Sequence, residues 1–176
     1  QGAILLIEEP EMFLHPQMQR SLYKTLQEIG KTNQVIYTTH SSHFVAVPDY
    51  DKVALVRKND DGTSVRLSDL PMDEKRKEKL LKELDPERNE LFFATRVLFV
   101  EGDTEKLAFP EYARRLCLDL DKAGASIVEV GGKRNLLEFS RIAGSFRIPF
   151  GVVYDEDSSD IKDKKEEADF NKQLDS

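Results

Sequence analysis

Short apolar runs alternate with amphipathic stretches along the first part of this 176-residue chain. Residues 3–7 form a continuous apolar run, which is typical of a strand buried on both faces of a parallel sheet. Apolar residues then recur at helical spacing from Pro16 to Gly30, and these two residues are favoured at the start and the end of a helix. A second β-rich run covers residues 35–39 and ends at His40. The pattern predicts a strand, a helix and a second strand.

The pattern changes after the second strand. Residues 52–58 and 63–67 flank an Asn-Asp-Asp-Gly turn, which predicts a β-hairpin. Residues 71–94 are dense in charge and predict a solvated, largely helical linker. We therefore expect two parts, residues 1–70 and residues 95–176, with the linker between them.

The alternation of strands and helices restarts in the second part. Three apolar runs predict strands, and two amphipathic stretches between them predict helices, the first containing Pro110, which should kink or divide it. The strands are expected at 97–100, 127–130 and 150–154, and the helices at 104–118 and 135–146. This order predicts an α/β fold with a parallel, Rossmann-like central sheet.

Composition excludes several classes of protein. A net charge of −7 rules out a histone-like polycation and argues weakly against binding nucleic acid through bulk charge. The single cysteine, Cys117, excludes a disulfide framework within the chain and fits a reducing cytoplasm. No apolar run approaches the ~18 residues that a membrane span needs. Because Gln1 leads straight into the first strand, we expect the chain to be a fragment of a larger protein.

Two carboxylates, Glu8 and Glu9, follow the first predicted strand. Ligands of open parallel sheets bind at the carboxyl ends of strands, where one carboxylate can hold Mg²⁺ and its neighbour can align an attacking water. The alternative is an ordinary junction between a strand and a loop, where acidic residues are common. The pair alone favours that alternative.

The surrounding residues change this balance. The sequence Glu-Glu-Pro-Glu-Met-Phe-Leu-His-Pro at 8–16, with Thr-Thr-His-Ser at 38–41, resembles the closing motifs of ABC-type ATPases of the RecF, SMC and OLD branch. The resemblance implies that Glu8 is the Walker B acid on the metal side and Glu9 the catalytic base. It also implies that His40 senses the γ-phosphate of ATP.

The same resemblance places a D-loop at residues 10–15. The chain contains neither a Gly-rich phosphate loop ending in Lys-Ser/Thr nor a Leu-Ser-Gly-Gly-like signature. We therefore expect the residues that complete the ATP site to lie upstream. His15 and His43 are interpreted as ordinary surface residues.

A second group of acids follows the strands of the C-terminal part. Glu101 ends one strand, Gly102 allows a tight turn, and Glu105 falls in the first turn of the next helix. Asp155 and Asp157 follow a later strand, and an extended backbone directs both to the same face. If the strands are neighbours, these like charges need divalent cations, and two cations suit phosphodiester cleavage. The alternatives are helix-capping acids and a solvated acidic loop.

This second pattern resembles a Toprim domain, and with the Glu-Gly-Asp-Thr-Glu motif it resembles the OLD (overcoming lysogenization defect) family, including Gabija-type nuclease subunits. The resemblance implies that the C-terminal portion of an ABC-type ATPase domain precedes a Toprim domain. It also implies that Glu101, Glu105, Asp155 and Asp157 bind two Mg²⁺ or Mn²⁺ ions, with Glu101 in a catalytic role.

Basic residues follow the middle strand of the C-terminal part. Gly131 and Gly132 would let backbone amides approach an anion, and Lys133 and Arg134 could meet a DNA phosphate. A plain turn with exposed basic residues explains the same sequence equally well.

The function implied by the resemblance is ATP-regulated, metal-dependent DNA cleavage in phage defence or DNA repair. It includes a homo-oligomer, a possible UvrD-like helicase partner, and a catalytic lysine beyond Ser176. Two alternatives stay open. One is a Toprim nucleotidyl transferase such as a primase or topoisomerase, and the other is an ABC-ATPase repair scaffold that binds DNA without cutting it.

Overall fold

A computed structural model describes residues 2–59, 62–71 and 85–155. Helices and mostly parallel strands alternate along these residues, so the prediction of an α/β fold is confirmed. The three 3₁₀ helices carry the labels η1 to η3. The elements are β1 (Ile4–Glu8), α1 (Pro16–Gly30), β2 (Gln34–Thr38), η1 (Ser42–Phe44), η2 (Val47–Lys52), β3 (Ala54–Asn59), β4 (Gly62–Leu67), η3 (Arg88–Phe92), β5 (Arg96–Val100), α3 (Asp103–Arg115), β6 (Ala125–Glu129), α4 (Lys133–Ser145) and β7 (Phe150–Val153).

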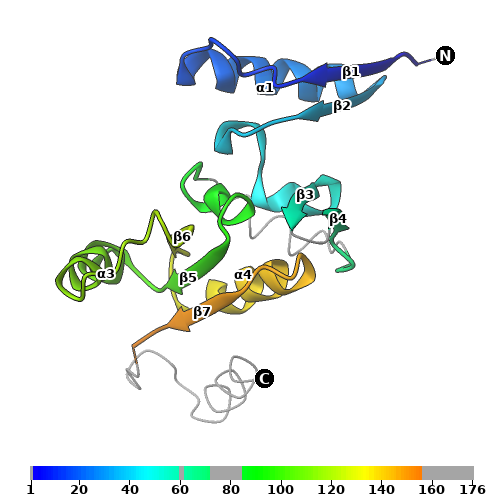
Figure 1. Ribbon diagram of the computed structural model, residues 1–176. Helices are drawn as coiled ribbons and strands as arrows, with labels where there is room; N and C mark the ends of the chain where they lie inside the picture. The colour runs from blue at the N-terminus through cyan, green and yellow to red at the C-terminus, as the bar shows by residue number, and fades with distance from the viewer. Residues whose placement is uncertain (1, 60–61, 72–84, 156–176) are drawn as a thin grey trace.

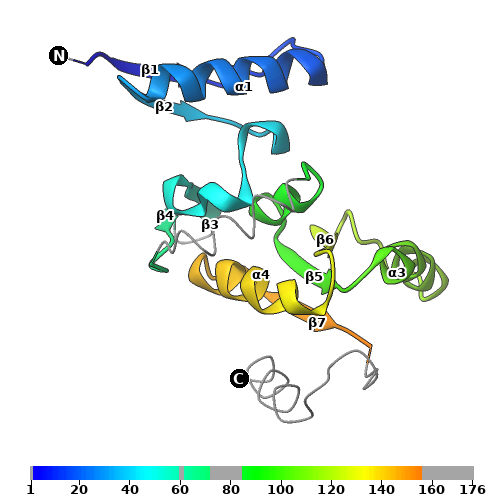
Figure 2. The ribbon, with the colours of Figure 1, turned by 180° about the vertical axis from the view of Figure 1, so that it is seen from behind.

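The N-terminal unit is a parallel pair of strands with one helix. β1 and β2 pair in register from Ile4 with Gln34 to Glu8 with Thr38. Helix α1 lies along one face of the pair, as both ribbon views show (Figures 1 and 2), and buries Leu26. The predicted helix bounds are confirmed at both ends.

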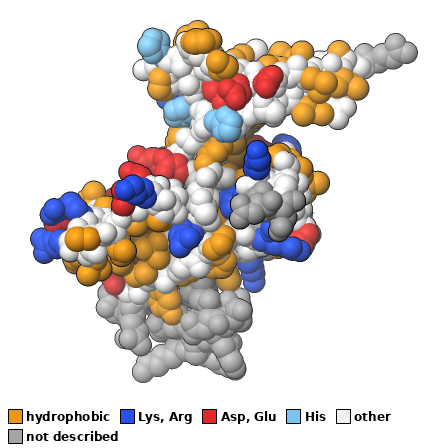
Figure 3. Space-filling model, viewed as in Figure 1, with side chains coloured by type: hydrophobic (Ala, Val, Ile, Leu, Met, Phe, Trp, Pro, Cys, Tyr) orange, Lys and Arg blue, Asp and Glu red, His pale blue; other side chains and the backbone are white. Residues whose placement is uncertain are grey.

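The expectation that residues 3–7 are buried on both faces is wrong. The strand forms, but Ile4 is 68% exposed and Leu6 is 71% exposed. Their neighbour Ile36 on β2 is 51% exposed, and hydrophobic side chains spread over this unit in the space-filling view (Figure 3). A continuous apolar run predicts a covered strand, but in the described residues a helix covers only one face of this sheet.

The C-terminal unit is a three-stranded parallel sheet in the order β6-β5-β7. The chain passes from β5 to one neighbour through α3, then returns across β5 to the other neighbour through α4. Right-handed crossovers in opposite directions place the two helices on opposite faces of the sheet. The three predicted strands and the two predicted helices are therefore confirmed. Helix α3 runs through Pro110 without a break, so the proline costs one backbone hydrogen bond without ending the helix.

A single hydrophobic core joins this sheet to segments far upstream in the sequence. Phe99 of β5 and Phe139 of α4 are fully buried and meet edge to face, with ring centroids 5.9 Å apart. The same core includes Val47 and Tyr50 of η2, and Leu91 and Phe92 of η3. Packing therefore connects the segment after β2 with the C-terminal unit.

Most of the predicted linker, residues 72–84, lies outside the described residues. The part that is described includes η3, where Leu91 and Phe92 belong to the core. The division of the chain at residues 71–94 stays a prediction. In the described ranges no helix combines the length and the apolar character that crossing a membrane requires.

Substitution of two leucines tests how much this core contributes to the free energy of unfolding. Leu136→Ala in α4 removes a fully buried side chain, so the free energy of unfolding should fall by about 2–5 kcal/mol. Leu107→Ala in α3 is the matched control, because Leu107 is 76% exposed, and it should change stability by less than about 0.5 kcal/mol. Urea denaturation followed by circular dichroism measures both, and equal losses would contradict the assigned core.

Candidate functional sites

Acidic residues from two neighbouring strands meet at one edge of the C-terminal sheet. Glu101 directly follows β5, and Asp155 lies two residues beyond β7. These strands are parallel neighbours, with Val100 opposite Val153, so their carboxyl ends reach the same edge. The backbone N–H of Asp155 donates a hydrogen bond to Glu101 Oε2 at 3.3 Å. The structure thus brings together two of the four predicted metal ligands.

Glu105 lies in the first turn of α3 and has a structural role there. Its Oε2 accepts a hydrogen bond from the backbone N–H of Gly102 at 3.1 Å, which is the glutamate half of a capping box. Gly102 itself is extended, with φ −146° and ψ −179°, so this turn does not depend on a glycine. Asp157, the fourth predicted ligand, lies outside the described residues.

The loop after β6 lies beside the strand ends that carry Glu101 and Asp155. Gly131 and Gly132 have φ values of 76° and 113°, a region that favours glycine, and Gly132 N–H donates to the backbone oxygen of Glu101 at 3.0 Å. Lys133 Nζ donates to the backbone oxygen of Asp155 at 3.2 Å. Arg134 is exposed beside it. The loop therefore places Lys133, the first residue of α4, beside the strand ends that carry Glu101 and Asp155, a region called here the acidic edge.

The carboxylate of Glu129 fixes this loop, and the sequence interpretation missed it. Glu129 ends β6 and pairs with Arg88 of η3 at 2.7 Å, with side chains only 15% and 12% exposed. Its other oxygen accepts from Gly131 N–H. An acid inside an apolar strand was the available signal, because a buried carboxylate needs partners.

The donor chemistry at this edge fits a divalent cation. Carboxylate oxygens are the ligands that Mg²⁺ prefers, and Glu101, Glu105 and Asp155 supply them around one strand end. Within residues 2–59, 62–71 and 85–155, however, no three His, Cys, Asp or Glu side chains are grouped closely enough to form a metal site. A complete site needs rearrangement of these side chains, a ligand beyond residue 155, or both.

The acids of the N-terminal unit meet the predicted switch histidine. Glu9 follows β1 with a φ of 42°, which is uncommon for a residue other than glycine. Its N–H donates to the backbone oxygen of Thr38 at 3.1 Å. His40 Nε2 lies 3.6 Å from Glu9 Oε1. The structure therefore brings Glu9 and His40 together, with Glu8 at the end of β1. Acidic and histidine side chains also lie close together on this unit in Figure 3.

Glu11 lies in the predicted D-loop, but the sequence interpretation gave its side chain no role of its own. Its Oε1 accepts hydrogen bonds from Thr39 Oγ1 and from His40 N–H, both at 2.7 Å. Its Oε2 is buried with no hydrogen-bond partner among the described residues. This carboxylate thus ties the loop after β1 to the loop that carries His40. Its position as the third acid of the Glu-Glu-Pro-Glu run was the available signal.

Two half-buried tyrosines, Tyr23 and Tyr37, contact Phe44 in the segment that follows His40. Tyr37 Oη donates to the backbone oxygen of Phe44 at 2.7 Å, which anchors η1 to β2. Burial and then the neighbouring Tyr23 raise the pKa of Tyr37, and burial raises the pKa of Tyr23 to about 12. The hydroxyl of Tyr37 therefore stays a hydrogen-bond donor at neutral pH.

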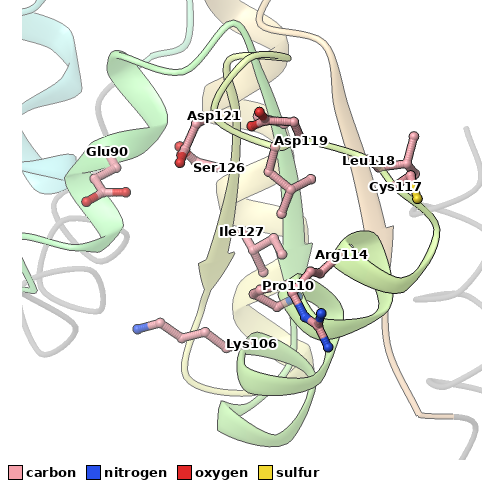
Figure 4. A pocket seen from close by; sticks show the side chains of 12 residues that line it. Glu90, Lys106, Pro110, Arg114, Cys117, Leu118, Asp119, Asp121, Ser126 and Ile127 are labelled. Atoms are coloured by element: carbon pink, nitrogen blue, oxygen red, sulfur yellow. The ribbon is translucent and has the colours of Figure 1, made fainter.

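A groove of about 660 Å³ lies away from both groups of acids. It runs between α3 and the edge strand β6, and its lining includes Pro110, Cys117 and Ile127 (Figure 4). Neither Glu101, Asp155 nor His40 lines it. The groove is therefore a different place on the molecule from either group of acids.

The arrangement of the C-terminal unit defines the class of this protein. Residues 92–157 match the family model described as the overcoming lysogenization defect protein-like TOPRIM domain, and residues 1–45 match the model of an AAA ATPase domain. The chain thus joins part of an ATPase domain to a TOPRIM domain. The chain is thus similar to the OLD family, which agrees with the resemblance that the sequence motifs indicated.

Curated relatives carry names that agree with this family. The chain is 37% identical to the OLD nuclease of Thermus scotoductus, over 96% of this chain and 34% of that protein. It is 29% identical to the Old nuclease of Escherichia phage P2, over 88% of this chain and 28% of that protein. It is 28% identical to the endonuclease GajA of Bacillus cereus strain HuB5-5, over 92% and 27%. The chain therefore spans about a third or less of the length of these relatives.

Two substitutions separate the capping role of Glu105 from any role as a ligand. Glu105→Ala removes the acceptor for Gly102 N–H and should lower stability by about 0.5–2 kcal/mol, measured by urea denaturation. Glu105→Gln keeps an oxygen acceptor and should retain most of this stability. A loss as large in the glutamine variant as in the alanine variant would contradict the capping assignment.

Proposed function

We propose that the protein containing this chain is a metal-dependent DNA endonuclease regulated by its ATPase domain. The observation that carries the proposal is the meeting of Glu101 and Asp155 at one sheet edge, within residues that match an OLD-like TOPRIM domain. Relatives with the names OLD nuclease and endonuclease GajA support DNA as the substrate. Phage defence or DNA repair is the biological setting that we favour.

The acidic edge would hold Mg²⁺ or Mn²⁺ through Glu101, Glu105 and Asp155, with Asp157 as a fourth ligand. When bound, a pair of such ions stabilises charge on the attacking and leaving oxygens of a phosphodiester. The chain's own contribution is placement, because the strand end fixes Glu101. Lys133 and Arg134, in the first turn of α4 beside this edge, would contact DNA phosphates.

The N-terminal unit would contribute to an ATP site with its own Mg²⁺. In this proposal Glu8 lies on the metal side, Glu9 acts as the general base, and His40 donates a hydrogen bond to the γ-phosphate. The 3.6 Å contact between Glu9 and His40 supports a shared site. A cytoplasmic location, homo-oligomerisation and a UvrD-like helicase partner stay predictions from the resemblance.

Two conservative substitutions test the nuclease site in the full-length protein. Glu101→Gln and Asp155→Asn each remove a carboxylate at the sheet edge, so Mg²⁺- or Mn²⁺-dependent nicking of plasmid DNA should fall by at least roughly 100-fold. Glu28→Gln and Asp51→Asn are the controls, because these exposed acids lie outside the proposed site and should leave nicking unchanged. Agarose gels measure the nicking rate, and calorimetric titration measures the binding of Mn²⁺.

Several results would reject this assignment. Undiminished nicking by both variants would remove the acidic edge as the reaction centre. Relaxed closed circles in place of nicked or linear DNA would favour a topoisomerase. A wild-type protein that binds DNA but neither binds Mn²⁺ nor cuts would favour a repair scaffold.

The switch histidine gives a separate test of the ATPase half. His40→Ala in the full-length protein should lower the rate of ATP hydrolysis by roughly 10-fold or more, because a charge-stabilising contact to the γ-phosphate is lost. Lys24→Ala is the control, since Lys24 is an exposed residue of α1 outside the predicted D-loop. Phosphate-release assays measure both, and an unchanged rate for His40→Ala would show that the switch assignment is wrong.

A further inference from the structure

Two consecutive residues of η3 contact the segments that adjoin the two candidate sites. The short helix lies between the β1–β2 unit and the C-terminal sheet in the ribbon view (Figure 1). Asn89 faces the segment that follows His40, and Arg88 faces the loop beside Glu101. We infer that the Arg88–Asn89 pair, defined here as the η3 clamp, is the positioning element through which the ATPase site regulates the nuclease site. This inference rests on the function proposed above.

The first arm of the clamp is buried. Asn89 is 6% exposed, and its amide Nδ2 donates to the backbone oxygens of Ser42 at 2.9 Å and Val45 at 2.7 Å. Its Oδ1 accepts from Val47 N–H at 3.1 Å. One side chain therefore binds both ends of η1. Because buried polar groups are costly to leave unpaired, η1 and η3 should move together.

The connection from η1 back to His40 is equally short. Ser41 separates His40 from η1, and its hydroxyl caps η1 by accepting from His43 N–H at 3.2 Å. Glu11 holds His40 N–H and Thr39, as described above. A displacement of His40 toward or away from a phosphate would therefore reach η1 through one intervening residue of backbone.

The second arm of the clamp reaches the nuclease edge. Arg88 Nη2 contacts Glu129 Oε2 at 2.7 Å, and Arg88 Nε donates to the backbone oxygen of Glu129 at 2.9 Å. Glu129 in turn accepts from Gly131 N–H, and Gly132 N–H donates to the backbone oxygen of Glu101. The guanidinium thus fixes the carboxylate that shapes the loop beside Glu101.

The surroundings of η3 favour its movement as one body. Leu91 and Phe92 anchor it in the core, and Glu87, which precedes it, pairs with Lys106 of α3. Lys106 directly follows Glu105 in the sequence. The Asn89 arm thus reaches Ser42, two residues from His40, and the Arg88 arm reaches Glu101 through Glu129 and the Gly131–Gly132 loop. Packed elements of this kind respond by shifting between discrete arrangements.

The test measures how far ATP changes DNA cleavage by the full-length protein. The readout is the ratio of Mn²⁺-dependent nicking rates with and without ATP, together with the rate of ATP hydrolysis. In Arg88→Ala this ratio should move toward 1 by roughly fivefold or more, the lower end of typical coupling between sites. ATP hydrolysis should stay within about twofold of wild type. Nicking with ATP should change by a larger factor than nicking without ATP.

Arg141→Ala is the matched control. It removes the same charge from an ion pair within α4, where Arg141 lies 3.5 Å from Glu138, and it should leave the ratio unchanged. If Arg88→Ala fails to fold by circular dichroism, Arg88→Lys provides the test. Lysine keeps the charge but cannot reproduce the two-point contact of the guanidinium, so this variant should also move the ratio toward 1.

The outcomes separate this inference from the nuclease proposal. A wild-type ratio of 1, or an unchanged ratio in the clamp variants, overturns the clamp while the nuclease assignment stands. An equal loss of nicking with and without ATP also overturns it, because the pair would then support only the fold. A wild-type protein that does not cut DNA with Mn²⁺, whether or not ATP is present, rejects the nuclease proposal and the clamp with it.

Discussion

Parallel pairing of β5 with both of its neighbours is the constraint on which the candidate nuclease site depends. Parallel strands end at the same edge, so Glu101, the Gly131–Gly132 loop and Asp155 meet there although they are separated along the chain. The hydrogen bond from Asp155 N–H to Glu101 draws two strand ends together before any ligand is present. A sheet with one strand reversed would send one of these groups to the opposite edge.

Local signals in the sequence were sufficient for the elements and for part of the site. Helix α1 begins at Pro16 and ends at Gly30, because each residue suits one end of a helix. The apolar runs form the parallel strands. The positions of the acids that follow strands were predictable, because parallel strands end at the same edge of a sheet. Their roles as ligands still come from resemblance, since the described side chains form no three-residue metal group.

The features that escaped prediction are contacts between segments distant in sequence. Arg88 and Glu129 are 41 residues apart, and only the folded chain shows that a charge in a linker neutralises a charge in a strand. The contacts of Glu11 were missed for another reason. Glu8 and Glu9 match the two acids that the ATPase motif requires, so the motif assigns no role to a third acid. The exposure of Ile4 and Leu6 was missed because hydrophobicity predicts a need for cover, not its presence.

The single cysteine allows the chain to be labelled at one position. Cys117 is exposed in the turn after α3, at the end of the helix opposite Gly102. With 13 residues, α3 spans about 20 Å, so a maleimide dye attached there would sit roughly that far from the acidic edge. Since the chain has one thiol, labelling places a single fluorophore at a defined point. Energy transfer to a dye on DNA would then report how the substrate approaches, without disturbing the carboxylates.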